Sequence, residues 1–420
     1  MAKHPLIRTL LDLRGNVRSC VYTEPMWGVP YNLFAPYASV YMLALGLTDG
    51  QIGSLASIGL AFQVLWTMLG GAITDKMGRR RTTLIFDLVA WSIPCLLWAA
   101  AQNFWYFLAG VIINAVGRVT MNSWQCLLVE DTDPKLLVDV WSWIYISGRA
   151  SAFFAPLAGL FIAQYTLVPT MRGLYLVAWV LMTAKFVLMY RITTETTQGE
   201  VRMRETAGQS LFGVLHEYPA VLRQILRSPQ TVFAGALLLI ITVCMVVNDT
   251  FWSVLVTEKL QIPAQYLAYF PLVRSLTVLT FFFLVMPRLR RMDVRTPMVF
   301  GFLGLIASQV LLVTTPVRGY VQLLFVMVLE GACIPATNTL LDKLVAVTVA
   351  PQERARIMSI LYVVVIVLTS PFGWIAGQLS EINRGLPFAL NIALFTLGAL
   401  LSFRASRAAG ERIAVGAAES

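Results

Sequence analysis

Long apolar runs follow one another along almost the whole chain, and they constrain its fold more than any other feature. A membrane-spanning helix needs about 20 mostly apolar residues. The runs are rich in Leu, Val and Ala and lack the strict alternation of a transmembrane barrel strand. In lipid, only a helix satisfies all its backbone groups within one segment. We therefore predict an all-α integral membrane protein with twelve transmembrane helices, over residues 21–45, 51–72, 82–101, 104–128, 138–164, 171–191, 229–256, 264–287, 297–315, 319–341, 355–379 and 386–405.

The composition supports a membrane protein and argues against a nucleic-acid partner. The chain is 58% hydrophobic and 13% charged, more apolar than a soluble fold of 420 residues can bury. Its net charge of +10 is explained by where the cations lie. The predicted outer loops hold only Arg172, Lys259, Arg318 and Arg384, and the inner segments hold most of the others. By the positive-inside rule we predict a multi-pass protein of the plasma membrane with both termini in the cytoplasm.

The apolar segments fall into two sets of six. We predict an N-terminal six-helix bundle over 1–192, a cytoplasmic connector over 193–228, and a C-terminal six-helix bundle with a cytoplasmic tail over 229–420. The connector is polar at first and amphipathic later. This pattern predicts a flexible stretch followed by an amphipathic helix on the inner membrane surface.

Weak internal repeats relate the two sets of segments at a nearly constant offset. Residues 133–135 are similar in type to residues 350–352, and residues 155–159 are similar in type to residues 370–374. The basic stretch 70–81, which follows the second segment, has a weakly similar counterpart at 286–295. Internal symmetry of this kind is typical of secondary transporters. The two bundles are therefore predicted to be pseudo-symmetric.

A short basic loop joins the second and third segments and reads Gly70-Gly71-Ala72-Ile73-Thr74-Asp75-Lys76-Met77-Gly78-Arg79-Arg80-Arg81. We call Gly70–Arg81 the signature loop, because its pattern resembles the signature loop of the major facilitator superfamily. The stretches 46–53 and 110–118 are also similar to that family. The residues that we expect to act as a conformational switch are Gly71, Asp75, Lys76, Gly78, Arg79 and Arg80.

The resemblance covers essentially the whole chain and implies a transport mechanism. It implies a monomeric transporter with alternating access, in which a small-molecule solute binds between the halves near the midplane. The signature loop would hold the cytoplasmic ends of the first bundle against the eleventh helix in the outward-open state. Asp75 would lie at a helix end and contact cations or helix N-termini there.

Polar side chains recur on one face of the fourth segment. Asn114, Arg118, Asn122 and Gln125 have helical spacing, and charges at this depth are costly unless they are paired or face water. The arginines of the fourth and fifth segments would favour an anionic group between them. Alternatively, both pair with protein carboxylates and hold helices together. The predicted solute contacts are Asn32, Asn114, Arg118, Asn122, Gln125, Tyr145, Arg149, Asp249 and Arg274.

Carboxylates inside the apolar segments are the candidates for proton coupling. Glu330 lies near the middle of the tenth segment with no neighbouring cation in the sequence, and we predict that it carries the proton. Glu24 is the second candidate, although it could instead be a static partner of Arg118 or Arg149. Asp249 and Arg274 lie at similar depths and could form a salt bridge. Asp87 and Lys185 are expected to be packing or snorkelling charges.

These features predict a transporter driven by an ion gradient. The chain has no Gly-x-x-x-x-Gly-Lys-Ser/Thr loop for ATP, and single carboxylates are enough for protons. No cofactor or metal is expected, because both histidines, His4 and His216, lie in predicted cytoplasmic segments. An enzyme is not predicted, since no nucleophile and base are found together at membrane depth.

The solute and the direction of transport leave alternatives open. The leading hypothesis is proton-coupled movement, in the direction of export, of an amphipathic organic solute. One alternative is proton-coupled uptake of a small organic anion held by Arg118 and Arg149. Another is a flippase for a lipid or glycolipid on the same fold, whose headgroup would meet those arginines.

Overall fold

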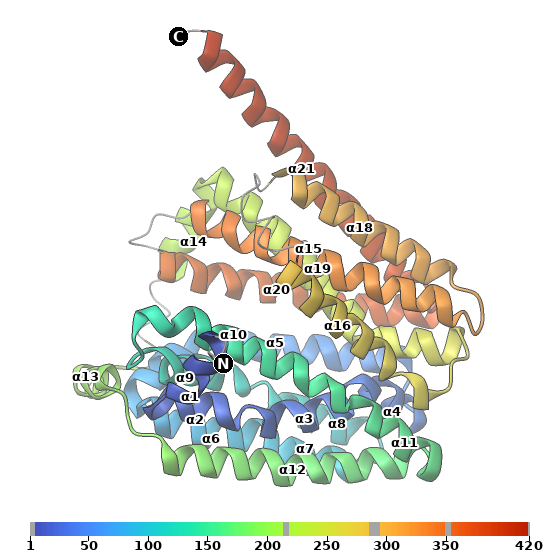
Figure 1. Cartoon of the computed structure of the whole chain (residues 1–420), viewed down its shortest axis with the longest axis horizontal. Helices are drawn as coiled ribbons and strands as arrows, with labels where there is room; N and C mark the ends of the chain where they lie inside the picture. The colour runs from blue at the N-terminus through green and yellow to red at the C-terminus, as the bar shows by residue number, and fades with distance from the viewer. Residues whose placement is uncertain (1–4, 213–217, 285–294, 349–353, 419–420) are drawn as a thin grey trace. The chain divides into compact units, whose positions relative to one another are not determined.

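The chain is built from helices that follow one another as the apolar runs predict (Figure 1). The computed structural model describes residues 5–212, 218–284, 295–348 and 354–418, and these ranges contain no strand. The residues group into two compact units. Unit 1 comprises Met1–Tyr218 and Ala264–Ala268, and unit 2 comprises Pro219–Pro263 and Tyr269–Ser420.

Unit 1 starts with a segment that is broken several times. After α1 (Pro5–Asp12), the chain forms α2 (Gly15–Thr23), α3 (Pro25–Phe34), a 3₁₀ turn and α4 (Ala38–Ala44). Pro25, Pro30 and Pro36 remove backbone donors along this stretch, and proline is a common cause of helix breaks and kinks. The first predicted segment is therefore a series of short helices.

The rest of unit 1 contains longer membrane segments. Several are divided by irregular turns, so a segment can comprise two labelled helices. The helices are α5 (Asp49–Met77), α6 (Arg79–Asp87), α7 (Ile93–Ala99), α8 (Phe104–Asn114), α9 (Gly117–Val129), α10 (Leu137–Ser151), α11 (Ala155–Tyr165), α12 (Leu167–Ile192) and α13 (Thr197–Thr206).

Unit 2 follows the same pattern with fewer breaks. Its helices are α15 (Pro229–Val254), α16 (Tyr269–Leu284), α18 (Arg295–Thr314), α19 (Tyr320–Thr348), α20 (Arg354–Ile382) and α21 (Leu386–Ala418), and the short α14 (Tyr218–Arg227) precedes them. The pair α18–α19 and the pair α16–α19 pack together within this unit.

The prediction of an all-helical membrane fold is confirmed. Within the described residues, ten helices are long and apolar enough to cross a membrane. The two predicted segments that do not reach this length are the broken first segment and α16, which has 16 described residues. The helix order is consistent with twelve predicted segments. The repeat stretches 286–294 and 350–352 lie outside the described residues.

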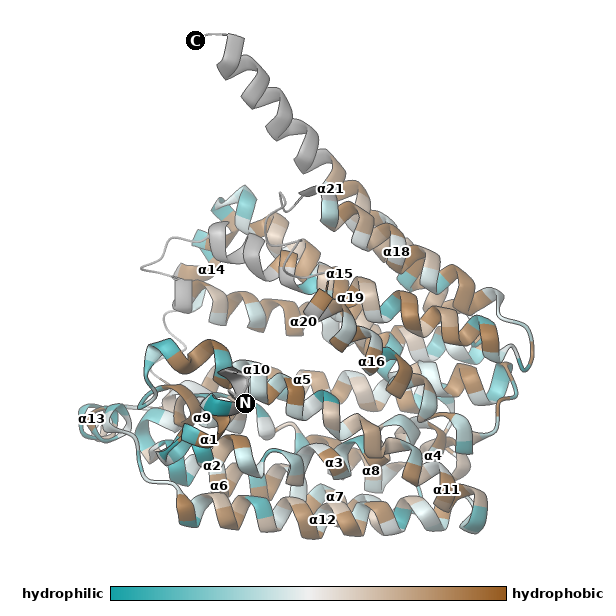
Figure 2. Ribbon diagram, in the orientation of Figure 1, coloured by the Kyte–Doolittle hydropathy of each residue, from teal (hydrophilic) through white to brown (hydrophobic). Residues whose placement is uncertain are grey.

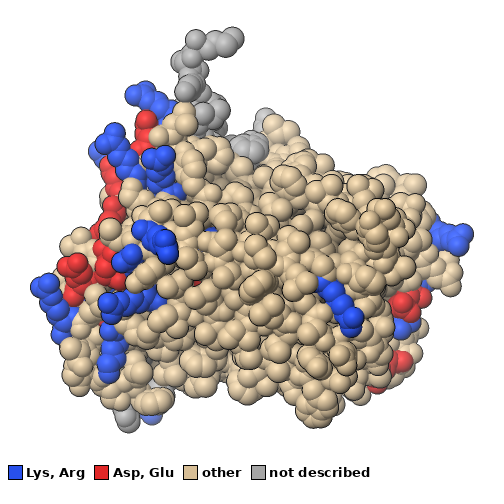
Figure 3. Space-filling view, turned by 90° about the horizontal axis from the view of Figure 1, so that it is seen from below, with Lys and Arg blue, Asp and Glu red and all other residues tan. Residues whose placement is uncertain are grey.

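The distribution of polarity along the helices agrees with a lipid environment. Figure 2 shows apolar residues along most of the long helices and hydrophilic residues on α13 and at many helix ends. On the face drawn in Figure 3, charged side chains gather toward the two ends, and the area between them is largely uncharged. An uncharged belt bounded by charged ends is what a bilayer requires of the surface it contacts.

Small residues allow helices to approach closely within each unit. A Cβ atom added to Gly59 of α5 would lie 2.6 Å from Cγ1 of Val111 in α8. One added to Gly331 of α19 would lie 2.8 Å from Cβ of Thr277 and 2.9 Å from the carbonyl oxygen of Arg274, both in α16. Because Gly331 follows Glu330, the contact between α16 and α19 also sets the position of that carboxylate.

We predict that Gly331→Ala lowers the stability of the protein in detergent by about 1–3 kcal/mol, because the added methyl group overpacks the contact between α16 and α19. The measurement is thermal unfolding of the purified variants. Gly173→Ala is the matched control, since a Cβ at Gly173 of α12 meets nothing within 4 Å. Equal melting temperatures for the two variants would contradict the close approach at Gly331.

Candidate functional site

The signature loop turns sharply at a glycine. Thr74–Met77 end α5, Gly78 has a φ of +82°, and α6 starts at Arg79. A Cβ at Gly78 would lie 2.6 Å from Oε2 of Glu195 and 2.8 Å from Sδ of Met203. Glycine is required at this position for both reasons, because its backbone is left-handed and because another segment contacts it closely.

Arg79 is the centre of the loop and is 4% exposed. Its guanidinium binds the Glu130 carboxylate through Nε and Nη2, with N–O distances of 3.0–3.2 Å. Its Nη1 lies 3.0 Å from Oδ1 of Asp75. Burial alone would raise the pKa of Glu130, but hydrogen bonds from Arg79 and from the Thr196 hydroxyl hold that pKa below its ordinary value. Glu130 is therefore ionised at neutral pH and neutralises the buried guanidinium.

The connector after α12 contributes two side chains to this cluster. The Glu195 carboxylate accepts hydrogen bonds from the backbone N–H groups of Arg79 (2.8 Å) and Arg80 (3.1 Å) at the start of α6. This interaction satisfies two of the amide donors that every helix start leaves free, and it places a negative charge at the positive end of the helix. Arg202 of α13 binds Oδ2 of Asp75 with its Nη2 at 3.1 Å.

Lys76 and Arg80 also contact the connector and the end of α12. Nζ of Lys76 donates to the carbonyl oxygen of Gln209. The Arg80 guanidinium donates to the carbonyl oxygen of Tyr190 and lies 4.1 Å from the centroid of that residue's ring. A Cβ at Gly71 would lie 4.0 Å from the amide nitrogen of Asn122 in α9, which is an ordinary van der Waals distance. Asp75 contacts two cations of unit 1, Arg79 and Arg202, and its expected role against the eleventh helix stays a prediction.

Two features of this region were not predicted from the sequence. We expected a flexible stretch at the start of the connector, but the structure has α13, which packs against α5. Glu130, Glu195 and Arg202 were not among the predicted site residues, although charged residues so close to a membrane segment are a detectable signal. Their partners lie 51 to 127 residues away in the chain, so helical spacing could not reveal them.

The predicted polar face of the fourth segment is divided by a break between α8 and α9. The amide of Asn114, the last residue of α8, donates to the carbonyl oxygen of Ala90, 2.7 Å away. Ala90 lies in a π-helical turn, Leu88–Ser92, where the regular hydrogen-bond ladder is disturbed. Asn114 therefore supports the neighbouring segment. Asn122, which donates weakly to the Thr74 hydroxyl, and Gln125 are exposed on α9.

Neither predicted anion-binding arginine is neutralised by an acid in the described part of the chain. Nε of Arg118 donates to Oε1 of Gln63 in α5 at 2.7 Å, which is a bond to a neutral amide. The Arg149 guanidinium lies 5.3 Å from the ring centroid of Tyr145 in α10. Asn32, the predicted contact in α3, donates to the carbonyl oxygen of Gly28 within its own helix.

Unit 1 contains a buried ion pair, between Lys185 and Glu24, that was not predicted from the sequence. Nζ of Lys185 in α12 lies 2.8 Å from Oε2 of Glu24, at the junction of α2 and α3, and both side chains are mostly buried. The rings of Trp27 and Trp124 lie about 6 Å from the same ammonium group. Lys185 is thus a partner of Glu24 and does not snorkel to the membrane surface. Glu24 is paired neither with Arg118 nor with Arg149.

Unit 2 brings Glu330 together with a cation that its sequence neighbourhood lacks. Nη1 of Arg274 in α16 lies 3.7 Å from Oε2 of Glu330, whose side chain is 1% exposed. Nε2 of Gln309 donates to Oε1 of Glu330 at 2.9 Å, and the Asn391 amide donates to Oε1 of Gln309. Arg274 forms its ion pair with Glu330 and not with Asp249. Asp249 lies on an exposed part of α15 and still interacts electrostatically with Arg274.

The described residues contain no group of three or more His, Cys, Asp or Glu side chains that could hold a metal ion. The chemistry of both units instead consists of charges and amides placed inside apolar helices. Such groups bind polar solutes and move protons in membrane proteins.

Comparison with known proteins identifies the family. The model of the Major Facilitator Superfamily matches residues 28–365. The chain belongs to this superfamily. The family is one of multi-pass membrane transporters. The resemblance of the signature loop predicted this correctly.

Two relatives match part of the chain. The chain is 27% identical over 131 residues to the uncharacterized MFS-type transporter YqjV of Bacillus subtilis, and 29% identical over 168 residues to the multidrug resistance protein MdtG of Serratia proteamaculans. The matches cover 30% and 38% of this chain, and they span 31% and 39% of those relatives.

Solved structures of transporters share the fold at low identity. The nucleoside transporter NupG aligns with a TM-score of 0.70 at 15% identity, over 93% of this chain and 98% of NupG. A bacterial homologue of the lysosomal transporter Spinster, in an inward-facing and unoccupied conformation, aligns with a TM-score of 0.67 at 14% identity, over 97% of this chain and 98% of that one.

We predict that Arg202→Gln separates α13 from the signature loop, because it removes the charge that binds Asp75 and leaves the rest of the helix intact. Amide hydrogen exchange in the connector should become faster, and exchange in the membrane helices should not change. Arg204→Gln is the control, because Arg204 lies on the same helix with a side chain that is 84% exposed. Equal exchange in the two variants would show that the bond between Arg202 and Asp75 does not hold α13.

Proposed function

We propose that the protein is a secondary active transporter of the plasma membrane that couples the movement of an amphipathic organic solute to protons, in the direction of export. The termini would lie in the cytoplasm, and the working unit would be a monomer surrounded by membrane lipid. The observation that carries the proton coupling is the carboxylate of Glu330, buried inside an apolar helix beside a single arginine.

The charge balance around Arg274 supports a role for Glu330 in proton transfer. Glu330 and Asp249 both interact electrostatically with this one cation. With both acids ionised, the three groups carry a net negative charge inside the membrane, which is unfavourable. Binding of one proton makes the group neutral. Interacting sites of this kind share their protons, so the proton belongs to the cluster and Glu330 is its most buried member.

Binding of a proton to Glu330 would change its contacts with the neighbouring side chains. The ionised carboxylate attracts Arg274 and accepts a hydrogen bond from Gln309. A proton on Glu330 removes the attraction to Arg274, and it exposes a guanidinium that is 31% accessible to another anionic or polar partner. In this proposal the signature loop of unit 1 acts as a conformational switch, with Asp75, Arg79 and Glu130 as its charged elements.

We predict that Glu330→Gln abolishes the accumulation of solute driven by a pH gradient in proteoliposomes, because the amide mimics the protonated state. Solute binding and solute-for-solute exchange should persist. Glu381→Gln, at the exposed end of α20, is the control and should transport normally. Glu24→Gln tests the rival carrier in unit 1. If Glu330→Gln still concentrates solute on a pH gradient, Glu330 is not the proton carrier.

A relative and the aromatic side chains of unit 1 support the proposed direction and solute class. One relative is named as a multidrug resistance protein, which favours export of amphipathic compounds. Aromatic side chains of unit 1 would provide apolar contacts for such solutes. The ring of Trp27 stacks on Tyr31 with centroids 4.8 Å apart, and Trp91 meets Trp27 edge-on.

A second candidate, movement of a small organic anion, is favoured by the state of Arg118. Its guanidinium has a neutral amide partner and no ion pair in the described residues. A solute carboxylate or phosphate would supply the missing negative charge. The headgroup of a lipid or glycolipid would do the same, as in a flippase. A further relative is named as a nitrate/nitrite transporter, matching 20% of this chain.

We predict that Arg118→Ala raises the apparent KM for an anionic solute about tenfold or more, as expected when one charge-assisted contact of roughly 1.4 kcal/mol or more is lost. Its melting temperature should stay near that of the native protein, since no carboxylate loses a partner. Arg191→Gln, at the exposed end of α12, is the matched control. An unchanged KM for every anion tested, lipids included, would remove Arg118 from the solute site.

A further inference from the structure

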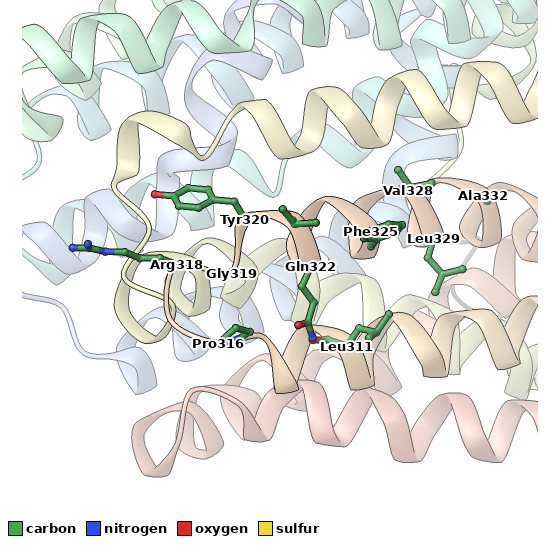
Figure 4. A pocket seen from close by; sticks show the side chains of 11 residues that line it. Leu311, Pro316, Arg318, Gly319, Tyr320, Gln322, Phe325, Val328, Leu329 and Ala332 are labelled. Carbon is green, nitrogen blue, oxygen red and sulfur yellow. The ribbon is translucent and has the colours of Figure 1, made fainter.

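Unit 2 has an apolar groove at the end where α18 leads into α19. Its volume is about 810 Å³, within the range of ligand sites in proteins. Residues from the end of α18, the connecting loop and the first half of α19 line it, and Figure 4 shows Arg318 at one end and Leu329 and Ala332 toward the other. From Tyr320 to Ala332 the helix rises about 18 Å, which is close to the depth of one leaflet of a bilayer with a 30 Å core.

The groove faces away from the packed interior of unit 2. Val321, Phe325 and Val328 lie on one face of α19, and they are 69%, 66% and 44% exposed. A row of exposed apolar side chains on a membrane-spanning helix is suited to contact with lipid tails. The amide of Gln322 is already used, since it donates to the carbonyl oxygen of Leu311 and to the Thr314 hydroxyl at the end of α18. The wall along α19 is thus suited to an acyl chain.

Arg318 supplies a positive charge where the groove meets the membrane surface. Two other cations lie at this end of unit 2, and both have partners. Nζ of Lys259 donates to the carbonyl oxygen of Val313, and Nη1 of Arg384 lies 3.5 Å from a carboxylate oxygen of Glu258. The side chain of Arg318 is exposed and has no carboxylate within ion-pair distance among the described residues.

The backbone holds Arg318 in place at an energetic cost. Its φ is +58°, a left-handed conformation that is unfavourable for a residue with a side chain, and Gly319 follows directly. The N–H group of Arg318 donates to the carbonyl oxygen of Leu260 at 2.8 Å, which fixes the turn to the neighbouring loop. Strained positions of this kind are often functional, and glycine would fit here better.

We propose that this groove is a binding site for one anionic phospholipid, with an acyl chain along α19 and the headgroup phosphate at Arg318. Charge complementarity selects this occupant, because an apolar channel of leaflet depth that ends in an unneutralised guanidinium matches a lipid with a negative headgroup. With the orientation proposed above, the lipid belongs to the outer leaflet. The site is independent of Glu330 and of the solute contacts in unit 1.

The test compares lipid retention by the native protein with that of Arg318→Gly and Arg318→Lys. Each protein is purified and mixed with phosphatidylglycerol or phosphatidylcholine, and bound lipid is counted by native mass spectrometry. Arg318→Gly should reduce retention of phosphatidylglycerol about fivefold, the effect of one cation on an anionic lipid. Arg318→Lys should keep most of it, and Arg384→Gln should behave as the native protein.

A thermal measurement separates lipid binding from misfolding. Without added lipid, Arg318→Gly should melt no lower than the native protein, since glycine relieves the left-handed backbone. Added phosphatidylglycerol should raise the melting temperature of the native protein and leave that of Arg318→Gly unchanged. Equal retention of phosphatidylglycerol by both proteins, or equal retention of the two lipids by the native protein, would overturn the proposal.

Discussion

The structure depends on one constraint, which is that a charge inside a membrane needs either a partner within the protein or access to water. Each unit meets this constraint separately. In unit 1 Lys185 pairs with Glu24, and in unit 2 Arg274 pairs with Glu330. Removing one member of such a pair leaves the other charge uncompensated in a medium that cannot solvate it. The two pairs therefore join helices that are distant in sequence, α2 and α3 with α12, and α16 with α19.

The two ion pairs differ in how much of their side chains is exposed, and this difference bears on what each pair can do. The ammonium group of Lys185 is bounded by two tryptophan rings and a carboxylate, and both partners are buried. The guanidinium of Arg274 is 31% accessible, and its ion pair with Glu330 is longer, at 3.7 Å. A closed pair suits a fixed joint between helices. A more open pair suits the role in proton transfer that we propose for Glu330.

The sequence predicted the helices well and the side-chain partners poorly, for physical reasons. A membrane helix is specified locally by about 20 apolar residues, so its position can be recognised without knowing the fold. The predicted 51–72 and 229–256 correspond to α5 and to α15 with its following turn. The polar face predicted to run through Asn114 and Arg118 is divided, because α8 ends at Asn114 and α9 starts at Gly117. That break, and the π-helical turn that Asn114 supports, depend on tertiary contacts with another segment.

The position of Glu195 has a consequence for the order in which the protein is assembled. The first turn of α6 is completed by a carboxylate that is synthesised more than a hundred residues later, after the last membrane helix of unit 1. While the chain is still being made, the amides of Arg79 and Arg80 have no such acceptor. The signature loop thus reaches its final form only when all six membrane segments of unit 1 have been inserted, and its closure marks the completion of that unit.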